Sequence, residues 1–130
     1  MSRKSEPSYS LEHVQATVAG DPKHLEVWIE WLRNNGLRPD GSITESQAVA
    51  VAAGARFTEA KVSNVKITKL VRKLVRTPPE AGSDWVAVER PRVKDIEIEP
   101  GPFKGGMIKP NQRLPIVFDP YTVLERLRAN

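Results

Sequence analysis

The chain contains no cysteine and only two histidines, His13 and His24, among its 130 residues. Without cysteine, disulfide bonds and thiolate chemistry are excluded, which fits a reducing compartment. The two histidines fall on different predicted helices and have neither HxxxH nor HExxH spacing. We therefore expect no metal site and no cofactor.

Long apolar runs are also missing. No stretch approaches the roughly 20 apolar residues that cross a bilayer, and the first residues, MSRKSEPS, hold no apolar signal-peptide segment. We expect a cytoplasmic protein with no membrane partner, in which residues 1–8 form a disordered basic arm. Aromatic residues are few, with three Trp, two Tyr and three Phe, and no RNP-like aromatic sheet is predicted. This scarcity disfavours RNA recognition.

Catalytic motifs are absent as well. Asp95, Glu97 and Glu99 lie on one face of a predicted strand, but no lysine follows at the spacing of a divalent-metal nuclease. A solvated hairpin face explains these acids better. The pair at 105–106 is a Gly-Gly without the lysine of a P-loop, and no nucleophile elbow is found. The sequence predicts a binding protein without catalytic residues.

The chain has an excess of positive charge, and this excess is concentrated in one stretch, residues 56–76. The net charge is +4 and the sequence pI is about 9.6. Residues 56–76 hold seven basic side chains and one acidic side chain, whereas residues 1–55 and 77–130 together carry a net negative charge. Because this stretch has few acids to neutralise it, its cations repel one another unless a polyanion binds. A solvated helix face is the alternative.

The pattern of this stretch predicts an amphipathic helix. Five apolar residues recur at the helical period and predict the core side: Ile67, Leu70, Val71, Leu74 and Val75. Four cations fall on the opposite side and form the predicted basic ridge: Lys66, Lys69, Lys73 and Arg76. We expect the helix to begin at an N-cap Thr58 and to end at Pro78. Val62 and Val65 are expected on the cationic side, away from the core.

Other elements are predicted from caps, periodicity and turns. They are helices over 10–20 and 22–35, a short extended piece at 42–43, a helix from Thr44 closed by Gly54, strands over 85–89 and 93–99 around the turn Arg90–Arg92, an irregular Pro/Gly-rich segment at 100–115, a strand at 116–118 and a final helix from Pro120. The second helix should bury Leu25, Trp28, Ile29 and Leu32, widened by Val27 and Trp31. The fold class is thus α+β and mainly helical.

This order of elements resembles the winged helix-turn-helix superfamily over about residues 22–99. The resemblance depends on Ala50 and Gly54 before the turn, on Val62-Ser63 after it, and on Trp85 opening the hairpin. It implies a winged helix-like DNA-binding domain over 9–99, with an N-terminal helix and a C-terminal extension, 100–130, packed on the same domain. One departure is the length between Gly54 and Val62, seven residues, where such motifs have a turn of about three to four.

The resemblance implies that the basic helix docks in the major groove of double-stranded DNA and that the hairpin tip acts as a wing. Phosphate contacts are expected from Lys66, Lys69, Arg72, Lys73 and Arg76, base contacts from Lys61, Ser63 and Asn64, and wing contacts from Arg90 and Arg92. The DNA-binding protein could regulate transcription or mark a site for replication, partition or packaging. The alternative is a protein-protein interaction module on the same scaffold, using Val62, Val65 and residues 100–115. A homodimer is left open by the sequence.

Overall fold

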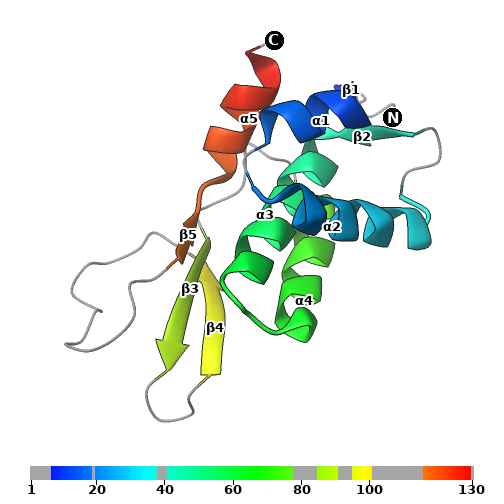
Figure 1. The fold of residues 1–130 in the computed structure, drawn as a ribbon. Helices are drawn as coiled ribbons and strands as arrows, with labels where there is room; N and C mark the ends of the chain where they lie inside the picture. Colours follow the sequence, from blue (N-terminus) through cyan, green and yellow to red (C-terminus); the bar gives the residue numbers. More distant parts are fainter. Residues whose placement is uncertain are drawn as a thin grey trace, which may run out of the picture.

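The computed structural model describes residues 7–18, 20–37, 41–77, 85–90, 95–100 and 116–129, with the backbone alone described for residues 88–90, 95 and 99. The described part contains five helices and two small antiparallel sheets, an α+β fold dominated by helices (Figure 1). The helices are α1 (Leu11–Thr17), α2 (Pro22–Asn34), α3 (Glu45–Glu59), α4 (Asn64–Val75) and α5 (Pro120–Arg128). The strands are β1 (Ser8–Ser10), β2 (Ser42–Thr44), β3 (Trp85–Arg90), β4 (Asp95–Pro100) and β5 (Ile116–Phe118).

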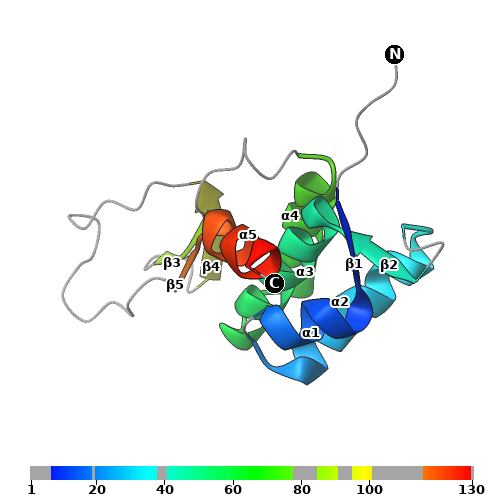
Figure 2. The same cartoon turned by 90° about the horizontal axis from the view of Figure 1, so that it is seen from above.

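Helix α3 forms the centre of the fold. It packs against α2, α4 and α5, and α2 lies on the opposite side of the α3–α4 pair from the β3–β4–β5 sheet (Figure 2). Its small apolar residues are almost all buried: Ala48, Val49, Ala50, Val51, Ala52, Ala53 and Ala55. Because these side chains are short, neighbouring helices can approach α3 closely and bury a continuous core around it.

The starts of α2, α3 and α5 agree with the predicted start signals. Thr44 and Gln47 form a reciprocal capping box, in which each side chain accepts from the other residue's backbone N–H. Asp21 and Asp119 each accept from a backbone N–H two residues later, with proline at the first helical position. The sequence signal at all three helices is confirmed.

The predicted end of the central helix at Gly54 is wrong. Helix α3 continues through Gly54 to Glu59, because the ring of Trp28 on α2 lies directly over this glycine. A Cβ atom built at Gly54 would come within 2.6 Å of the Trp28 ring. Thr58, predicted as an N-cap, is instead within α3, where its hydroxyl accepts from Trp28 Nε1 at 2.9 Å and donates to the carbonyl of Gly54 at 2.7 Å. The glycine therefore permits a close helix crossing and does not terminate the helix.

The turn after α3 consists of the four residues Ala60–Ser63, so its length matches the usual turn between two such helices. Lys61 has a φ of 65°, which reverses the chain direction here. Val62 is 6% exposed and belongs to the core, contrary to the prediction that it lies on the cationic side. Val65 is 67% exposed, as predicted. Helix α4 begins at Asn64 and not at Thr58.

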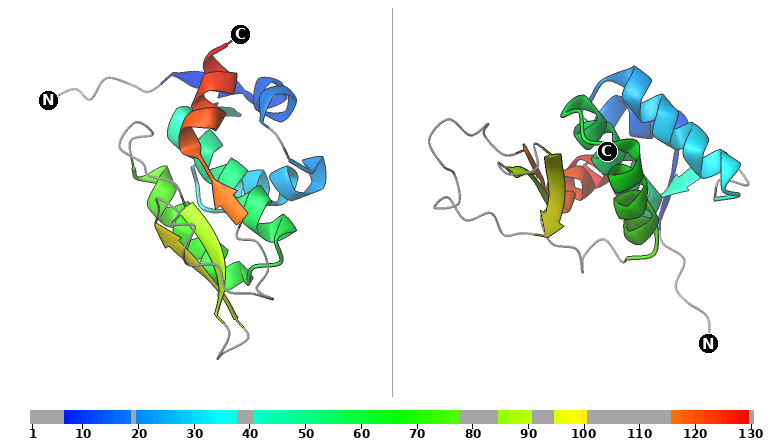
Figure 3. Two further views of the ribbon diagram at one scale, coloured as in Figure 1. Left: turned by 90° about the vertical axis from the view of Figure 1, so that its left-hand side faces the viewer. Right: turned by 90° about the horizontal axis from the view of Figure 1, so that it is seen from below.

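Two small sheets flank the helices, and both are antiparallel. Strand β1 pairs with β2, Ser8 opposite Thr44, so Ser8 belongs to a strand although residues 1–8 were expected to be disordered. The predicted hairpin is confirmed: β3 pairs with β4 from Trp85 opposite Pro100 to Arg90 opposite Asp95. Strand β5 pairs with the other edge of β3, which gives the order β4-β3-β5 (Figure 3). The extended piece β2 is therefore in a separate sheet from the hairpin.

The predicted core stripes are confirmed with three exceptions on two helices. On α2, Leu25, Trp28, Ile29 and Leu32 are buried, and on α4, Ile67, Leu70, Val71 and Leu74 are buried. Val27 is 57% exposed, so it does not widen the core as predicted, and Trp31 on α2 and Val75 on α4 are only partly buried.

An ion pair between a buried carboxylate and a half-exposed arginine links both ends of the described chain to the start of α3. Glu45 is 2% exposed, and Arg128 donates to it through Nε and Nη2, both at 2.8 Å. Tyr9 on β1 donates a further hydrogen bond at 2.9 Å. The hydrogen bonds from Arg128 lower the pKa of Glu45 below its ordinary value, against the opposing effect of burial. Burial, followed by the hydrogen bond to Glu45, raises the pKa of Tyr9.

Candidate nucleic-acid interface

The outward face of α4 carries one continuous line of exposed side chains. Val65, Lys69, Arg72 and Arg76 are all exposed and follow the spacing i, i+4, i+7 and i+11, which keeps residues on one side of a helix. The buried residues of α4 lie opposite this line. We call these four residues the α4 outer face. Three of the four are cations, and α4 contains no acidic residue.

The cations of the α4 outer face have no acidic partner in the part of the chain that the structure describes, where the ion pairs are Arg33–Glu30, Lys66–Glu97 and Arg128–Glu45. Arg72 lies 6.0 Å from the centre of the Trp31 ring on α2, at the outer limit of a cation–π contact. Its guanidinium group can therefore still bind an anion, and so can the groups of Lys69 and Arg76.

Lys66, predicted to be on the ridge, is turned toward the hairpin instead. Its Nζ donates at 2.9 Å to the carboxylate of Glu97 and at 2.9 Å to the carbonyl of Ile96. The Lys66 side chain is only 23% exposed. The structure thus separates Lys66 from the outer face and gives it a structural role, since it fixes β4 against α4.

Lys73 also points to the sheet, but it remains exposed. Its Nζ lies 5.1 Å from the centre of the Trp85 ring at the start of β3, a cation–π geometry. Between α4 and the hairpin there is a groove of about 310 Å³, lined by Lys66, Lys69, Leu70, Lys73, Trp85, Glu97 and Ile98. Three lysines against one carboxylate make this groove cationic. We call it the α4–hairpin groove.

Three residues predicted to contact bases lie together at the front of α4. Lys61, Ser63 and Asn64 are all exposed, in the turn and at the first position of the helix. Ser63 is the N-cap residue, yet its side chain makes no capping hydrogen bond. The first turn of α4 has no acidic residue either. The helix N-terminus therefore presents uncompensated backbone N–H groups beside a hydroxyl, an amide and an ammonium group.

The two arginines predicted for the wing are placed only in part. Arg90 is the last residue of β3, with its backbone opposite Asp95. Arg92 and the rest of the connection at 91–94 lie outside the described residues, as does the predicted irregular segment at 101–115. Of the two predicted wing residues, the structure therefore places only the backbone of Arg90, at the end of β3.

Sequence reasoning missed the contribution of Trp85 and Glu97 to this surface. Trp85 was used only to mark the start of the hairpin, and Glu97 was assigned to a solvated face. Glu97 binds Lys66, which is 31 residues away in the chain. A signal was present, because the side chains of a hairpin that follows a basic helix must lie near that helix if the connection is short. Alternation along the strand alone does not show which helix residue each acid meets.

Other kinds of site are not found in the described part of the chain. It contains no group of three or more His, Asp or Glu side chains that could hold a metal ion. None of its helices has the length and apolarity needed to span a membrane. Comparison of the whole chain with protein-family models, with curated proteins and with solved structures gives no match.

Proposed function

We propose that the protein binds double-stranded DNA, with α4 entering the major groove. The observation that carries this proposal is the α4 outer face, where Lys69, Arg72 and Arg76 are exposed and unpaired among the described residues. Such cations release counterions from DNA when they meet phosphates, which is the main source of non-specific affinity. The α4–hairpin groove adds Lys73 at the side of the same helix.

The front of α4 supports readout of bases. In helix-turn-helix proteins the N-terminal residues of the second helix reach the base edges, and α4 begins with Ser63, Asn64 and Val65 after a four-residue turn. Asparagine pairs well with adenine, and an exposed valine can contact a thymine methyl group. We therefore assign base contacts to Asn64 and Val65, and phosphate contacts to Lys61, Lys69 and the cations further along α4.

The position of the hairpin supports the same orientation of DNA on α4, with the hairpin acting as a wing. Lys66 anchors β4 to the flank of α4 through Glu97 and the Ile96 carbonyl. With this anchor in place, a duplex on α4 has the hairpin beside it, and Arg90 stands at the end of β3 nearest the tip. We propose that Lys66 acts through the hairpin and not through a phosphate, and that Arg90 and Arg92 contact the DNA backbone or minor groove.

A protein-interaction module is the second candidate function. Val65 is 67% exposed at the front of α4, and an exposed apolar residue at the centre of a surface can serve as a binding anchor. In that case the cations around Val65 would select an acidic partner protein and not a nucleic acid. The two functions differ in what binds α4. A DNA-binding protein binds a duplex directly, whereas a protein-interaction module binds an acidic protein and no duplex.

Titration of a fluorescent duplex with the intact protein tests the proposal. The variant Lys69→Glu with Lys73→Glu removes two phosphate contacts, each of which contributes about 0.9 to the slope of log K against log salt. At about 0.1 M salt, one decade below 1 M, the loss is therefore roughly 60-fold, before added repulsion. The matched control is Arg33→Glu, an exposed arginine near the end of α2. It lowers the net charge by two units on α2, half of the change that the double variant makes on α4.

The outcome distinguishes the candidates. DNA binding predicts a large loss for the double variant, little change for Arg33→Glu, and weaker binding of the parent to single-stranded DNA than to duplex. A loss in Arg33→Glu that is half of the double variant's loss in log K would mean that only the overall charge matters. If the parent itself does not bind duplex at low salt, the proposal is wrong and the surface is better assigned to a protein partner.

A further inference from the structure

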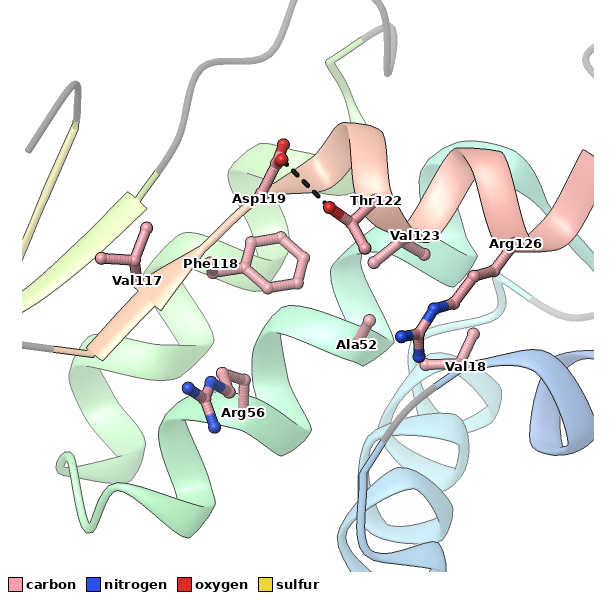
Figure 4. A pocket seen from close by; sticks show the side chains of 9 residues that line it. All are labelled: Val18, Ala52, Arg56, Val117, Phe118, Asp119, Thr122, Val123 and Arg126. Atoms are coloured by element: carbon pink, nitrogen blue, oxygen red, sulfur yellow. Dashed lines mark hydrogen bonds between the residues drawn. The ribbon is translucent and has the colours of Figure 1, made fainter.

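A second hollow lies between α3, β5 and α5, and no residue of α4 lines it. Its volume is about 230 Å³, and Figure 4 shows the side chains around it. The floor is apolar, formed by Ala52, Phe118 and Val123, all of them buried. The ring of Phe118 packs against the ring of Phe57, with ring centres 6.3 Å apart. The floor of the hollow is therefore continuous with the apolar core.

Two arginines line the hollow beside this apolar floor. Figure 4 shows the guanidinium group of Arg126 turned toward Ala52, and that of Arg56 on the opposite side of Ala52, below Phe118. In the described part of the chain neither side chain has a hydrogen bond or an ion pair. The one acid at the hollow, Asp119, is occupied, because its carboxylate caps α5 and accepts from Thr122 at 3.0 Å. Two uncompensated cations over apolar surface favour an anionic partner with an apolar part.

The hollow runs along the outer edge of β5. Successive side chains of a strand point to opposite faces of the sheet, so a hollow that touches both Val117 and Phe118 must pass around the strand edge. Strand β3 occupies one edge of β5 through the pairs Val86–Val117 and Trp85–Phe118. No residue of β3 lines the hollow. The hollow is therefore on the edge of β5 that has no neighbouring strand among the described residues.

We propose that this hollow binds a short acidic segment of another protein as an added strand along β5. The segment places an apolar side chain on Phe118 and Ala52, and carboxylates on Arg56 and Arg126, while its backbone pairs with the strand edge. Charge favours an acidic partner over a second copy of this chain, whose net charge is +4. The site is separate from α4, so it does not depend on the proposed DNA binding.

The probe for this site is a short peptide, acetylated and amidated at its ends, with a central valine, a glutamate at the second position on either side, and threonine elsewhere. In an extended chain these three side chains share one face. Nuclear magnetic resonance titration of the full chain should shift the backbone signals of Ile116, Val117 and Phe118. The variants Arg56→Glu and Arg126→Glu should each weaken binding about tenfold, and Arg33→Glu should leave it unchanged.

Two altered probes test the two parts of the proposal. The same peptide with glutamine in place of glutamate should bind much more weakly, because it cannot pair with the arginines. A peptide with methylated central amides should also lose affinity, because it cannot donate to the edge of β5. The proposal is overturned if no peptide signal shift maps to β5, if the methylated peptide binds equally well, or if the free small acids glutarate and valerate bind as tightly as the peptide.

Discussion

The substitution Gly54→Ala tests the packing on which the position of α4 depends. Gly54 lies within α3 under the Trp28 ring, and an added Cβ would lie 2.6 to 2.8 Å from three ring atoms. The ring has little freedom to move, because Trp28 is 3% exposed and its Nε1 donates to Thr58. The methyl group must therefore push α2 away from α3 or turn the indole off its partner.

The magnitude follows from three opposing contributions. Alanine favours a helix interior over glycine by about 1 kcal/mol. Overpacking a close crossing costs about 1 to 3 kcal/mol, and a buried indole N–H left without an acceptor costs about 1 to 3 kcal/mol. With both costs at their central values, the net result is a loss of about 3 kcal/mol in the free energy of unfolding. For a domain of this size that corresponds to a fall in Tm of roughly 12 °C.

Urea denaturation followed by circular dichroism measures this change, and a second background isolates its cause. In Trp28→Leu the indole is gone, so Gly54→Ala should there be neutral or stabilising by up to about 1 kcal/mol. If Gly54 were a terminal glycine in the left-handed conformation, alanine would cost the same in both backgrounds. An equal loss in both, or no loss in the parent, would refute the close crossing of α2 over α3.

Three further predictions concern the core, the ion pair of Glu45 with Arg128 and the wing. Arg128→Ala leaves the carboxylate of Glu45 buried without its main partner and should lower the free energy of unfolding by about 2 to 3 kcal/mol, measured by urea denaturation. Because the pKa of Glu45 is lower in the folded state than in the unfolded state, its contribution is present above about pH 4.3 and is lost as the pH falls through the folded-state pKa. Glu45→Gln should accordingly flatten stability on the acid side, and an unchanged acid profile would contradict the pairing. Leu74→Asp places a charge in a position that is 4% exposed and should unfold the domain, as seen by loss of helical circular dichroism. Arg90→Ala with Arg92→Ala should weaken duplex binding by about 1 to 3 kcal/mol with an unchanged Tm, whereas unchanged binding would remove the wing assignment.

The features predicted correctly from the sequence are those determined by neighbouring residues. The caps at Thr44 and Asp119 depend on backbone groups two or three residues away, and the core stripe of α4 depends on the helical period. Gly54 and Thr58 were misassigned because Trp28, 30 residues before Thr58, determines their roles. A glycine in a helix interior and a glycine after a helix look alike until the partner is known.

In the candidate site, too, the local pattern was predicted correctly and the distant contacts were not. The sequence indicates that α4 is basic on one side, but it does not distinguish the cations that stay exposed from the one that fixes the hairpin. Lys66 and Lys69 look equivalent in the sequence, yet Lys66 binds Glu97 while Lys69 stays exposed. Likewise Arg56 belongs to the basic stretch in the sequence, but the continuation of α3 places it beside β5 and away from α4.

The salt dependence of binding to a duplex of random sequence tests the central claim most directly. If Lys61, Lys69, Arg72, Lys73 and Arg76 each contact one phosphate, these five contacts give log K a slope of roughly −4.5 against log salt, since each contributes about 0.9. The slope should flatten by about 1.8, to about −2.7, in the variant Lys69→Glu with Lys73→Glu and stay unchanged in Arg33→Glu. A parent slope near zero, or a slope that the double variant leaves unchanged, would contradict the assignment of α4 to DNA.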